Sequence, residues 1–116
     1  MDGKVRFGLI TARGWTVIVP SDKHIVDIDV IAKIRDGAFQ AMNLGFTRII
    51  FDFSNVEFAD EKLLGALEEV LVRSKAEGGA LRLTGFHRGV LGGYEVGDLK
   101  EKYEVFETRE AALEAA

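Results

Sequence analysis

The chain has 116 residues, of which 47% are hydrophobic and 29% charged, as is typical of one compact domain with a real hydrophobic core. It contains no cysteine, which excludes disulfides, thiolate zinc sites and cysteine nucleophiles and favours a cytoplasmic location. The net charge is −4, so phosphate backbones are repelled and nucleic acid is not an expected partner. No apolar window approaches the length of a membrane span, and we expect a soluble protein without membrane insertion.

The first third of the chain predicts a hairpin followed by a helix. Residues 5–11 and 15–19 are two strand-like runs that are separated by Arg13 and Gly14. Apolar residues then recur at helical spacing between residues 30 and 42, which predicts a long helix. Gly37 is a weak point within this helix, and Asn43 and Gly45 are its candidate C-terminal caps.

The centre of the chain predicts a parallel βαβ unit. Residues 48–53 are almost continuously apolar, as in a central strand that is covered on both faces. A strand at 80–84 follows a helix that ends at Gly78, and such a helix is the crossover between two parallel strands. The apolar stripe of this second helix consists of Leu63, Leu64, Leu67, Val70, Leu71 and Ser74.

The last third predicts three short elements. They are a glycine-interrupted helical segment at 90–96, an edge strand at 103–106 and a terminal helix that is capped by Thr108. The whole order is β-β-α-β-α-β-α-β-α. We therefore expect an α/β fold with a mixed central sheet of about five strands and about four helices.

The segment between residues 48 and 112 carries a family likeness. Residues 49–60 combine an apolar strand, an Asp-x-Ser beginning at Asp52 and an apolar-x-Asp that ends at Asp60. Leu-Gly-Ala-Leu at 64–67, the helix end at 75–79, Gly-Asp-Leu at 97–99 and Glu-Ala-Ala-Leu at 110–113 follow in order. In this combination the chain resembles the STAS domain of bacterial anti-sigma factor antagonists. The resemblance implies a single STAS-like domain over residues 1–116, without catalytic activity, that binds a kinase-like anti-sigma factor and so controls sigma factor release.

The start of the second helix departs from the family signature. That signature is Asp-Ser-(Ser/Thr)-Gly-Leu-Gly, with the first Ser as phosphoacceptor, whereas residues 60–65 here read Asp-Glu-Lys-Leu-Leu-Gly. Glu61 therefore stands at the phosphorylation-equivalent position. It is compatible with a fixed phosphate-like charge, with loss of the switch, or with a surface charge that only favours the helix dipole. The resemblance implies that the partner-binding residues are Asp60, Glu61, Lys62, Leu64 and Gly65.

The remaining candidate residues favour structural roles. Asp60 is placed to cap the second helix, whether or not it also faces a partner. Asp52 needs loop N–H groups to satisfy it, and its alternative role as a receiver-type phosphoacceptor lacks the acidic pair that would follow the first strand. His24 and His87 have no neighbouring His or Cys at ligand spacing, so we expect neither metal nor cofactor.

Two alternatives to an anti-sigma factor antagonist stay open. The chain could be a STAS subunit of another regulatory assembly, either transporter-associated or stressosome-like. It could also be a small enzyme or nucleotide binder that uses Asp52, Asp60, Glu61 and His87, although it has no phosphate-loop or nucleophile-elbow motif. We expect no enzyme. The sequence also leaves open whether the chain forms a homodimer.

Overall fold

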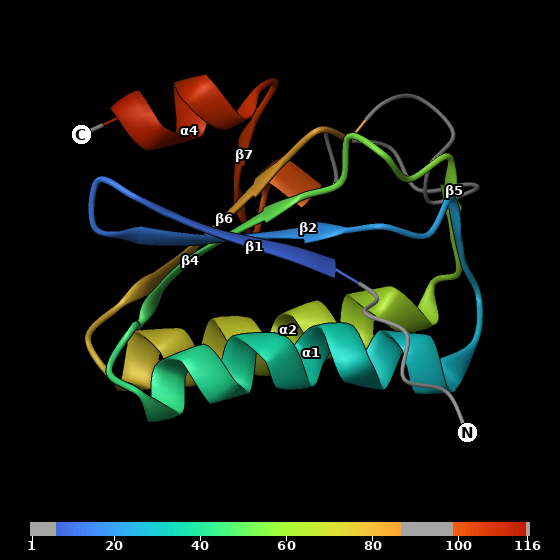
Figure 1. Ribbon diagram of the computed structural model, residues 1–116, viewed down its shortest axis with the longest axis horizontal. Coiled ribbons are helices and arrows are strands. Elements are labelled where there is room, and N and C mark those ends of the chain that lie inside the picture. Colours follow the sequence, from blue (N-terminus) through green and yellow to red (C-terminus); the bar gives the residue numbers. More distant parts are fainter. Residues whose placement is uncertain (1–6, 87–98, 116) are drawn as a thin grey trace.

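The computed structural model describes residues 7–86 and 99–115, which form one five-stranded sheet with helices on both of its faces (Figure 1). None of the described helices is long and apolar enough to cross a bilayer. In chain order the elements are β1 (Phe7–Ala12), β2 (Trp15–Pro20), β3 (His24–Ile25), α1 (Ile28–Asn43), β4 (Arg48–Asp52), β5 (Phe58–Ala59), α2 (Lys62–Ala76), β6 (Ala80–Thr84), β7 (Glu104–Phe106) and α4 (Arg109–Glu114).

The sheet has the strand order β1-β2-β4-β6-β7. β2, β4, β6 and β7 are parallel to one another, and β1 joins β2 in antiparallel fashion. Helices α1 and α2 lie side by side on one face, as expected when two successive right-handed crossovers connect neighbouring strands, and α4 lies on the other face (Figure 1). The predicted mixed α/β fold is confirmed. The predicted helix at 90–96 lies outside the described residues.

The first two strands form the predicted hairpin. Ala12 and Trp15 face each other across the turn, and the two residues between them, Arg13 and Gly14, have φ angles of 52° and 82°. Two positive φ angles define a type I′ turn, whose twist matches that of the flanking strands. The hairpin therefore has a two-residue loop. Of the strand predicted at 5–11, residues 5 and 6 lie outside the described residues.

Gly37 lies in the middle of α1, and the helix is unbroken there. Its missing side chain makes room for the ring of Phe7. A Cβ atom at this position would lie 2.5 Å from Cζ of Phe7, so the phenyl ring of β1 packs directly on the backbone of α1. This close approach explains why a residue that costs about 1 kcal/mol in a helix is found in its middle.

Both long helices end at a glycine with positive φ. Gly45 follows α1 with a φ of 94°, and Gly78 follows α2 with a φ of 79°. The prediction of helix ends at these two glycines is confirmed. Asn43 is not a cap but the last residue of α1, and Leu44 occupies the cap position. The left-handed turn falls on Gly45 because glycine adopts positive φ without steric cost.

The core is divided by the sheet. The larger part lies between the sheet and α1 with α2, and it includes the fully buried Phe51 and Leu67. The smaller part lies beneath α4 and contains Trp15, Val17, Ile50 and Ala112. This division matches the reading of residues 48–53 as a strand that is buried on both faces.

One arginine holds α4 against the sheet. Arg82 of β6 is buried, and its Nε donates to Glu104 at 2.7 Å. Its guanidinium also donates to the carbonyls of Ala112 and Ala115 at the end of α4, where free carbonyls need donors. The same group lies 4.4 Å from the ring of Trp15, so it is both paired and stacked.

Candidate functional site

The loop before α2 is fixed to the start of the first crossover by a second, two-stranded sheet. β3 and β5 are parallel, with Ile25 opposite Ala59. The N–H groups of Glu57 and Phe58 both donate to the carbonyl of Lys23, and the N–H of Asp60 donates to the carbonyl of Ile25 at 2.8 Å. This small sheet was not predicted from the sequence. It brings the beginnings of α1 and α2 to the same end of the molecule (Figure 1).

Asp60 caps the first turn of α2, as predicted. Its Oδ1 accepts from the N–H of Lys62 at 2.9 Å, and its carbonyl accepts from the N–H of Leu63 at 3.0 Å. A carboxylate here also faces the positive end of the helix dipole. The conformation of the first turn is therefore determined by Asp60 and does not depend on the side chain of the next residue.

Glu61 is exposed and is not needed for capping. It lies one residue before the first residue of α2, already with helical φ and ψ, and its side chain makes no cap hydrogen bond. Lys62 is also exposed, and its Nζ lies 3.9 Å from Oδ2 of Asp60. Leu64 is half-buried against the larger core. All five predicted partner-binding residues thus lie just before α2 or in its first turn, where Asp60 and Leu64 are half-buried and the other three are exposed.

Gly65 faces solvent where no packing requires a glycine. A Cβ atom at this position would have no heavy atom of the described residues within 4 Å, and the residue is exposed. Because glycine weakens a helix interior by about 1 kcal/mol relative to alanine, its presence here is not explained by the stability of the fold.

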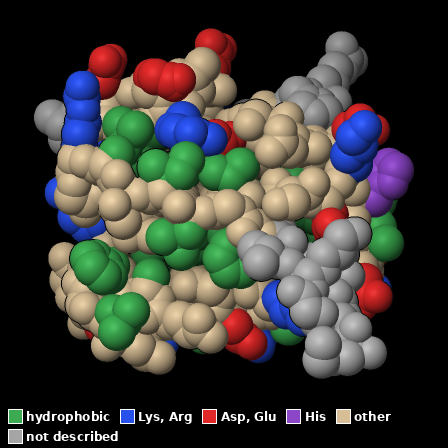
Figure 2. All heavy atoms as spheres, in the orientation of Figure 1, with side chains coloured by type: hydrophobic (Ala, Val, Ile, Leu, Met, Phe, Trp, Pro, Cys, Tyr) green, Lys and Arg blue, Asp and Glu red, His purple; other side chains and the backbone are tan. Residues whose placement is uncertain are grey.

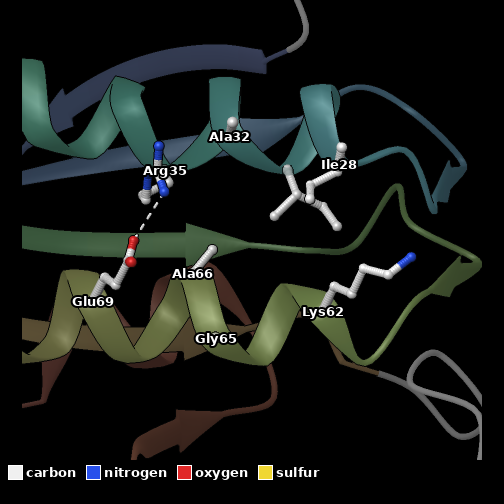
Figure 3. Close-up of a pocket in the computed structure, with 8 residues that line it drawn as sticks. Ile28, Ala32, Arg35, Lys62, Gly65, Ala66 and Glu69 are labelled. Carbon is white, nitrogen blue, oxygen red and sulfur yellow. Dashed lines mark hydrogen bonds and ion pairs between the residues drawn. The ribbon is translucent and has the colours of Figure 1, made fainter.

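A groove of about 240 Å³ runs between α1 and α2 beside Gly65 (Figure 3). The backbone of Gly65 and the small side chains of Ala32 and Ala66 leave it open, and Lys62 lies at one end. Its lining residues are Ile28, Ile31, Ala32 and Arg35 from α1, and Lys62, Gly65, Ala66 and Glu69 from α2.

The other end of the groove is closed by an ion pair between the helices. Arg35 donates through Nε to Asp36 at 3.1 Å and through a terminal guanidinium nitrogen to Oε2 of Glu69 at 3.0 Å. Figure 3 shows the pair with Glu69. These two hydrogen bonds raise the pKa of the Arg35 guanidinium. Its guanidinium carbon also lies 5.7 Å from the ring centroid of Phe39. The pair therefore bridges the two helices on this side of the groove.

Exposed apolar residues also lie in the segments that lead into α1 and α2. Ile28 is 66% exposed, and Val26 and Phe58 are also exposed although they are large and hydrophobic. Together with Glu61, Lys62 and Gly65 they form what we call the helix-start surface. The charged residues within and beside it are mainly acidic: Asp27, Asp29, Asp60 and Glu61, against Lys62. The surface therefore combines apolar side chains with a negative surround.

Asp52 is bound by the fold itself. Its side chain is 6% exposed; Oδ1 accepts from the N–H of Ser54 at 3.0 Å and Oδ2 from Nε of Arg109 at 2.9 Å. The predicted satisfaction by loop N–H groups is confirmed, but Arg109 from α4 is a second partner that the sequence did not indicate. Asp52 contacts α4, whereas Asp60 caps α2, so the two carboxylates serve different elements.

His24 has one acidic neighbour among the described residues. Nε2 of His24 lies 3.8 Å from Oε1 of Glu57, and both side chains are well exposed. Across residues 7–86 and 99–115, no three His, Asp or Glu side chains come together as metal ligands. His87 lies outside the described residues, as does Asp98.

Only Lys62 and Gly65 of the groove were predicted as site residues from the sequence; the other six lining residues were not, namely Ile28, Ile31, Ala32, Arg35, Ala66 and Glu69. Ile28 follows the N-cap Asp27 and lies off the apolar stripe that begins at Val30, which is a usable signal of an exposed apolar side chain. The pairing of Arg35 with Glu69 joins residues 34 positions apart, and only the packing of α1 on α2 brings them together.

The comparisons with known proteins agree with this fold. The STAS domain family matches residues 14–112, and the chain belongs to that family. No curated protein sequence matches the chain.

Several solved structures are similar to it. A protein from Thermotoga maritima assigned as an anti-sigma factor antagonist is 20% identical with a TM-score of 0.79, over 93% of this chain and 92% of that one. An anti-sigma factor antagonist (STAS) domain protein from Planctomyces limnophilus is 19% identical with a TM-score of 0.77, over 92% and 94%. The RsbS protein of Moorella thermoacetica, in a form with serine replaced by glutamate, is 14% identical with a TM-score of 0.69, over 94% and 95%. At these identities the likeness establishes the shared fold.

Proposed function

We propose that this chain is a non-catalytic regulatory module of the anti-sigma factor antagonist type, which binds its protein partner through the helix-start surface and the adjoining groove. Membership of the STAS family and the similarity to anti-sigma factor antagonists support this role. Within the described residues, Asp60 caps α2 and Arg35 pairs with Glu69, whereas the exposed Glu61 makes no cap hydrogen bond.

The observation that carries the proposal is Gly65. At this exposed helical position a Cβ atom would meet no neighbour within 4 Å in the described part of the chain, so no packing observed there requires a glycine. A glycine that costs stability and leaves a groove open is explained if another molecule approaches the backbone of α2 closely. The surrounding apolar residues, including the 66% exposed Ile28, would then be covered by that molecule.

The chemistry of the surface indicates the kind of partner. Apolar side chains within a mainly acidic surround fit a protein surface with an apolar anchor and basic residues around it. An anti-sigma factor that presents such a surface is the partner we propose. An encounter with a transcription regulator would take place in the cytoplasm.

Glu61 would act in this interface as a charge that cannot be switched. Its carboxylate is exposed and is not used to cap α2, so it is available to a partner. A carboxylate carries one negative charge, whereas a phosphate carries about 1.5 to 2, and it cannot accept a phosphoryl group as a stable ester. Binding would therefore be set by the amount and location of the partner and not by phosphorylation at residue 61.

Site-specific photocrosslinking in the native cell tests the proposal. A photoreactive amino acid would be placed at residue 61 in one variant, and at Lys75 in a matched variant. Lys75 is also exposed on α2, but it lies at the opposite end of the helix. Mass spectrometry of the adducts should identify an anti-sigma factor from position 61 and not from position 75. Equal capture from both positions would contradict the proposed surface. An adduct with a small-molecule substrate in place of a regulatory protein would contradict the proposed role.

A further inference from the structure

The two edges of the five-stranded sheet differ in how they are protected. β7, at one edge, has only three residues, and one of them is Glu104. β1, at the other edge, has six residues from Phe7 to Ala12 with no charged residue and no proline. Edge strands normally carry such residues, because their unpaired N–H and C=O groups can recruit another strand. Among residues 7–86 and 99–115, no strand pairs with the outer side of β1, so this edge offers a place for strand addition.

Exposed apolar side chains flank this edge on both faces of the sheet. Leu9 is 53% exposed and Ile10 is 40% exposed. Successive residues of a strand point to opposite faces, so Leu9 lies on the face of α1 and α2, and Ile10 on the face of α4. Figure 2 shows hydrophobic side chains gathered on the face of the molecule that carries β1. A strand added to β1 would cover both residues.

We propose that this added strand is β1 of a second copy of the chain, so that two sheets join around a two-fold axis. The two copies would pair their β1 strands in antiparallel fashion, with the helices α1 and α2 of both copies on the same face. This homodimer would use a surface distinct from the helix-start surface and would leave that surface free.

The hairpin turn determines the register. The type I′ turn joins Ala12 to Trp15 by its own hydrogen bond, and in an antiparallel ladder every second residue then bonds to β2. This leaves the backbone groups of Phe7, Leu9 and Thr11 directed outward. When two such edges pair, Leu9 lies opposite Leu9 of the second copy, and Phe7 lies opposite Thr11.

The same register makes the edge complementary to itself. It places Ile10 opposite Gly8 of the second copy, where no side chain obstructs the isoleucine; a Cβ at Gly8 would have only one neighbour, 4.0 Å away. No pair in this register brings charges together, although the chain as a whole carries a net charge of −4. Two copies can therefore pair along β1 without opposing like charges, and each copy supplies the Gly8 that makes room for Ile10 of the other, which fits a second copy as the added strand.

Sedimentation velocity of the full chain over a wide range of concentration provides the first test. The parent should be a dimer that dissociates on dilution, and Leu9→Lys should weaken dimerisation about tenfold or more, because two ammonium groups would then face each other. Val72→Lys is the matched control, since Val72 is 62% exposed on α2, and it should dimerise like the parent. A parent that stays monomeric over the whole concentration range would overturn the proposal. The edge at β1 would then be available only to another protein.

Disulfide trapping tests the register without relying on a destabilised variant. The chain has no cysteine, so each variant contains one thiol. Leu9→Cys should give a covalent dimer on mild oxidation, because Cα atoms of a directly opposed pair lie about 5.5 Å apart, within disulfide range. Thr11→Cys should not, since its two thiols would be separated by four residue steps, or about 13 Å. Equal trapping of both variants, or of neither, would contradict the pairing.

Discussion

The two ends of α2 contain similar residue types that serve different purposes. At the C-terminal end, Gly78 adopts a positive φ, and Gly79 lies so close to Thr47 that a Cβ would come within 1.9 Å of its carbonyl oxygen. At the N-terminal end, Gly65 has free space around it, and Glu61 makes no cap hydrogen bond. The glycines at the C-terminal end are explained by the fold, whereas Gly65 is not. Residues that the fold does not require are the best indicators of a binding surface.

The largest loss of stability is expected from a substitution in the middle of α2, where the helix packs on the sheet. Leu67 is almost completely buried between the helix and the sheet. Leu67→Ala should lower the free energy of unfolding by about 2 to 5 kcal/mol, because it removes buried methyl groups and leaves a cavity. Urea denaturation measures this. Leu64→Ala is the control on the same helix; since Leu64 is half-buried, its loss should be clearly smaller. Equal losses would mean that both leucines contribute equally to the core.

A glycine-to-alanine change at the C-terminal end should be the next most damaging. Gly79→Ala places a methyl group against the backbone of Thr47, which a rotation of a side chain cannot relieve. We expect a loss of about 1 to 3 kcal/mol, as for other overpacked sites. Thermal and urea unfolding would report it, and a variant as stable as the parent would show that the close contact with Thr47 is not rigid.

A glycine-to-alanine change at the N-terminal end should increase stability instead of lowering it. Gly65→Ala should raise the free energy of unfolding by about 0.5 to 1 kcal/mol, because alanine is the better helix former and the new methyl group meets no neighbour. Gly37→Ala is the matched control within α1, where the methyl group would meet the ring of Phe7 at 2.5 Å and should destabilise the protein. A destabilised Gly65→Ala would show that the fold needs this glycine after all.

The smallest effect on stability is expected at Glu61. Glu61→Ser should change the free energy of unfolding by no more than about 0.5 kcal/mol, because Asp60 and not Glu61 caps the helix. If Glu61 acts as a fixed phosphate-like charge, the serine variant should bind a kinase-like anti-sigma factor more tightly than the parent. If the switch is simply lost, the two affinities should agree within a few-fold. Markedly weaker binding by the variant would show that the carboxylate itself makes a favourable contact.

Most of the fold follows from local patterns in the sequence. The hairpin around Gly14, the buried strand from Arg48, the stripe of α2 and the cap at Thr108 were all predicted, because each depends on residues close together in the chain. The small sheet of β3 and β5 was not predicted. Each of its strands has only two residues, which is too short for a recognisable hydrophobic period.

The candidate site was predicted only as far as it is local. Asp60 and the residues after it belong to one continuous segment, and the cap could be inferred from residue type and position. The groove also requires α1, and the pairs Arg35 with Glu69 and Asp52 with Arg109 join residues 34 and 57 positions apart. Such pairs are determined by the packing of helices, which a single sequence does not reveal.

The central claim, that the start of α2 is a binding surface the fold leaves open, is tested most directly by calorimetric titration of the anti-sigma factor captured at residue 61. The parent chain would be compared with Gly65→Leu, whose Cβ would meet no described neighbour within 4 Å and whose longer side chain would project beside the groove, on a helix that leucine favours. We predict that Gly65→Leu unfolds no more easily than the parent but binds at least about tenfold more weakly, which corresponds to about 1.4 kcal/mol. Unchanged affinity in a stable Gly65→Leu variant would contradict the claim.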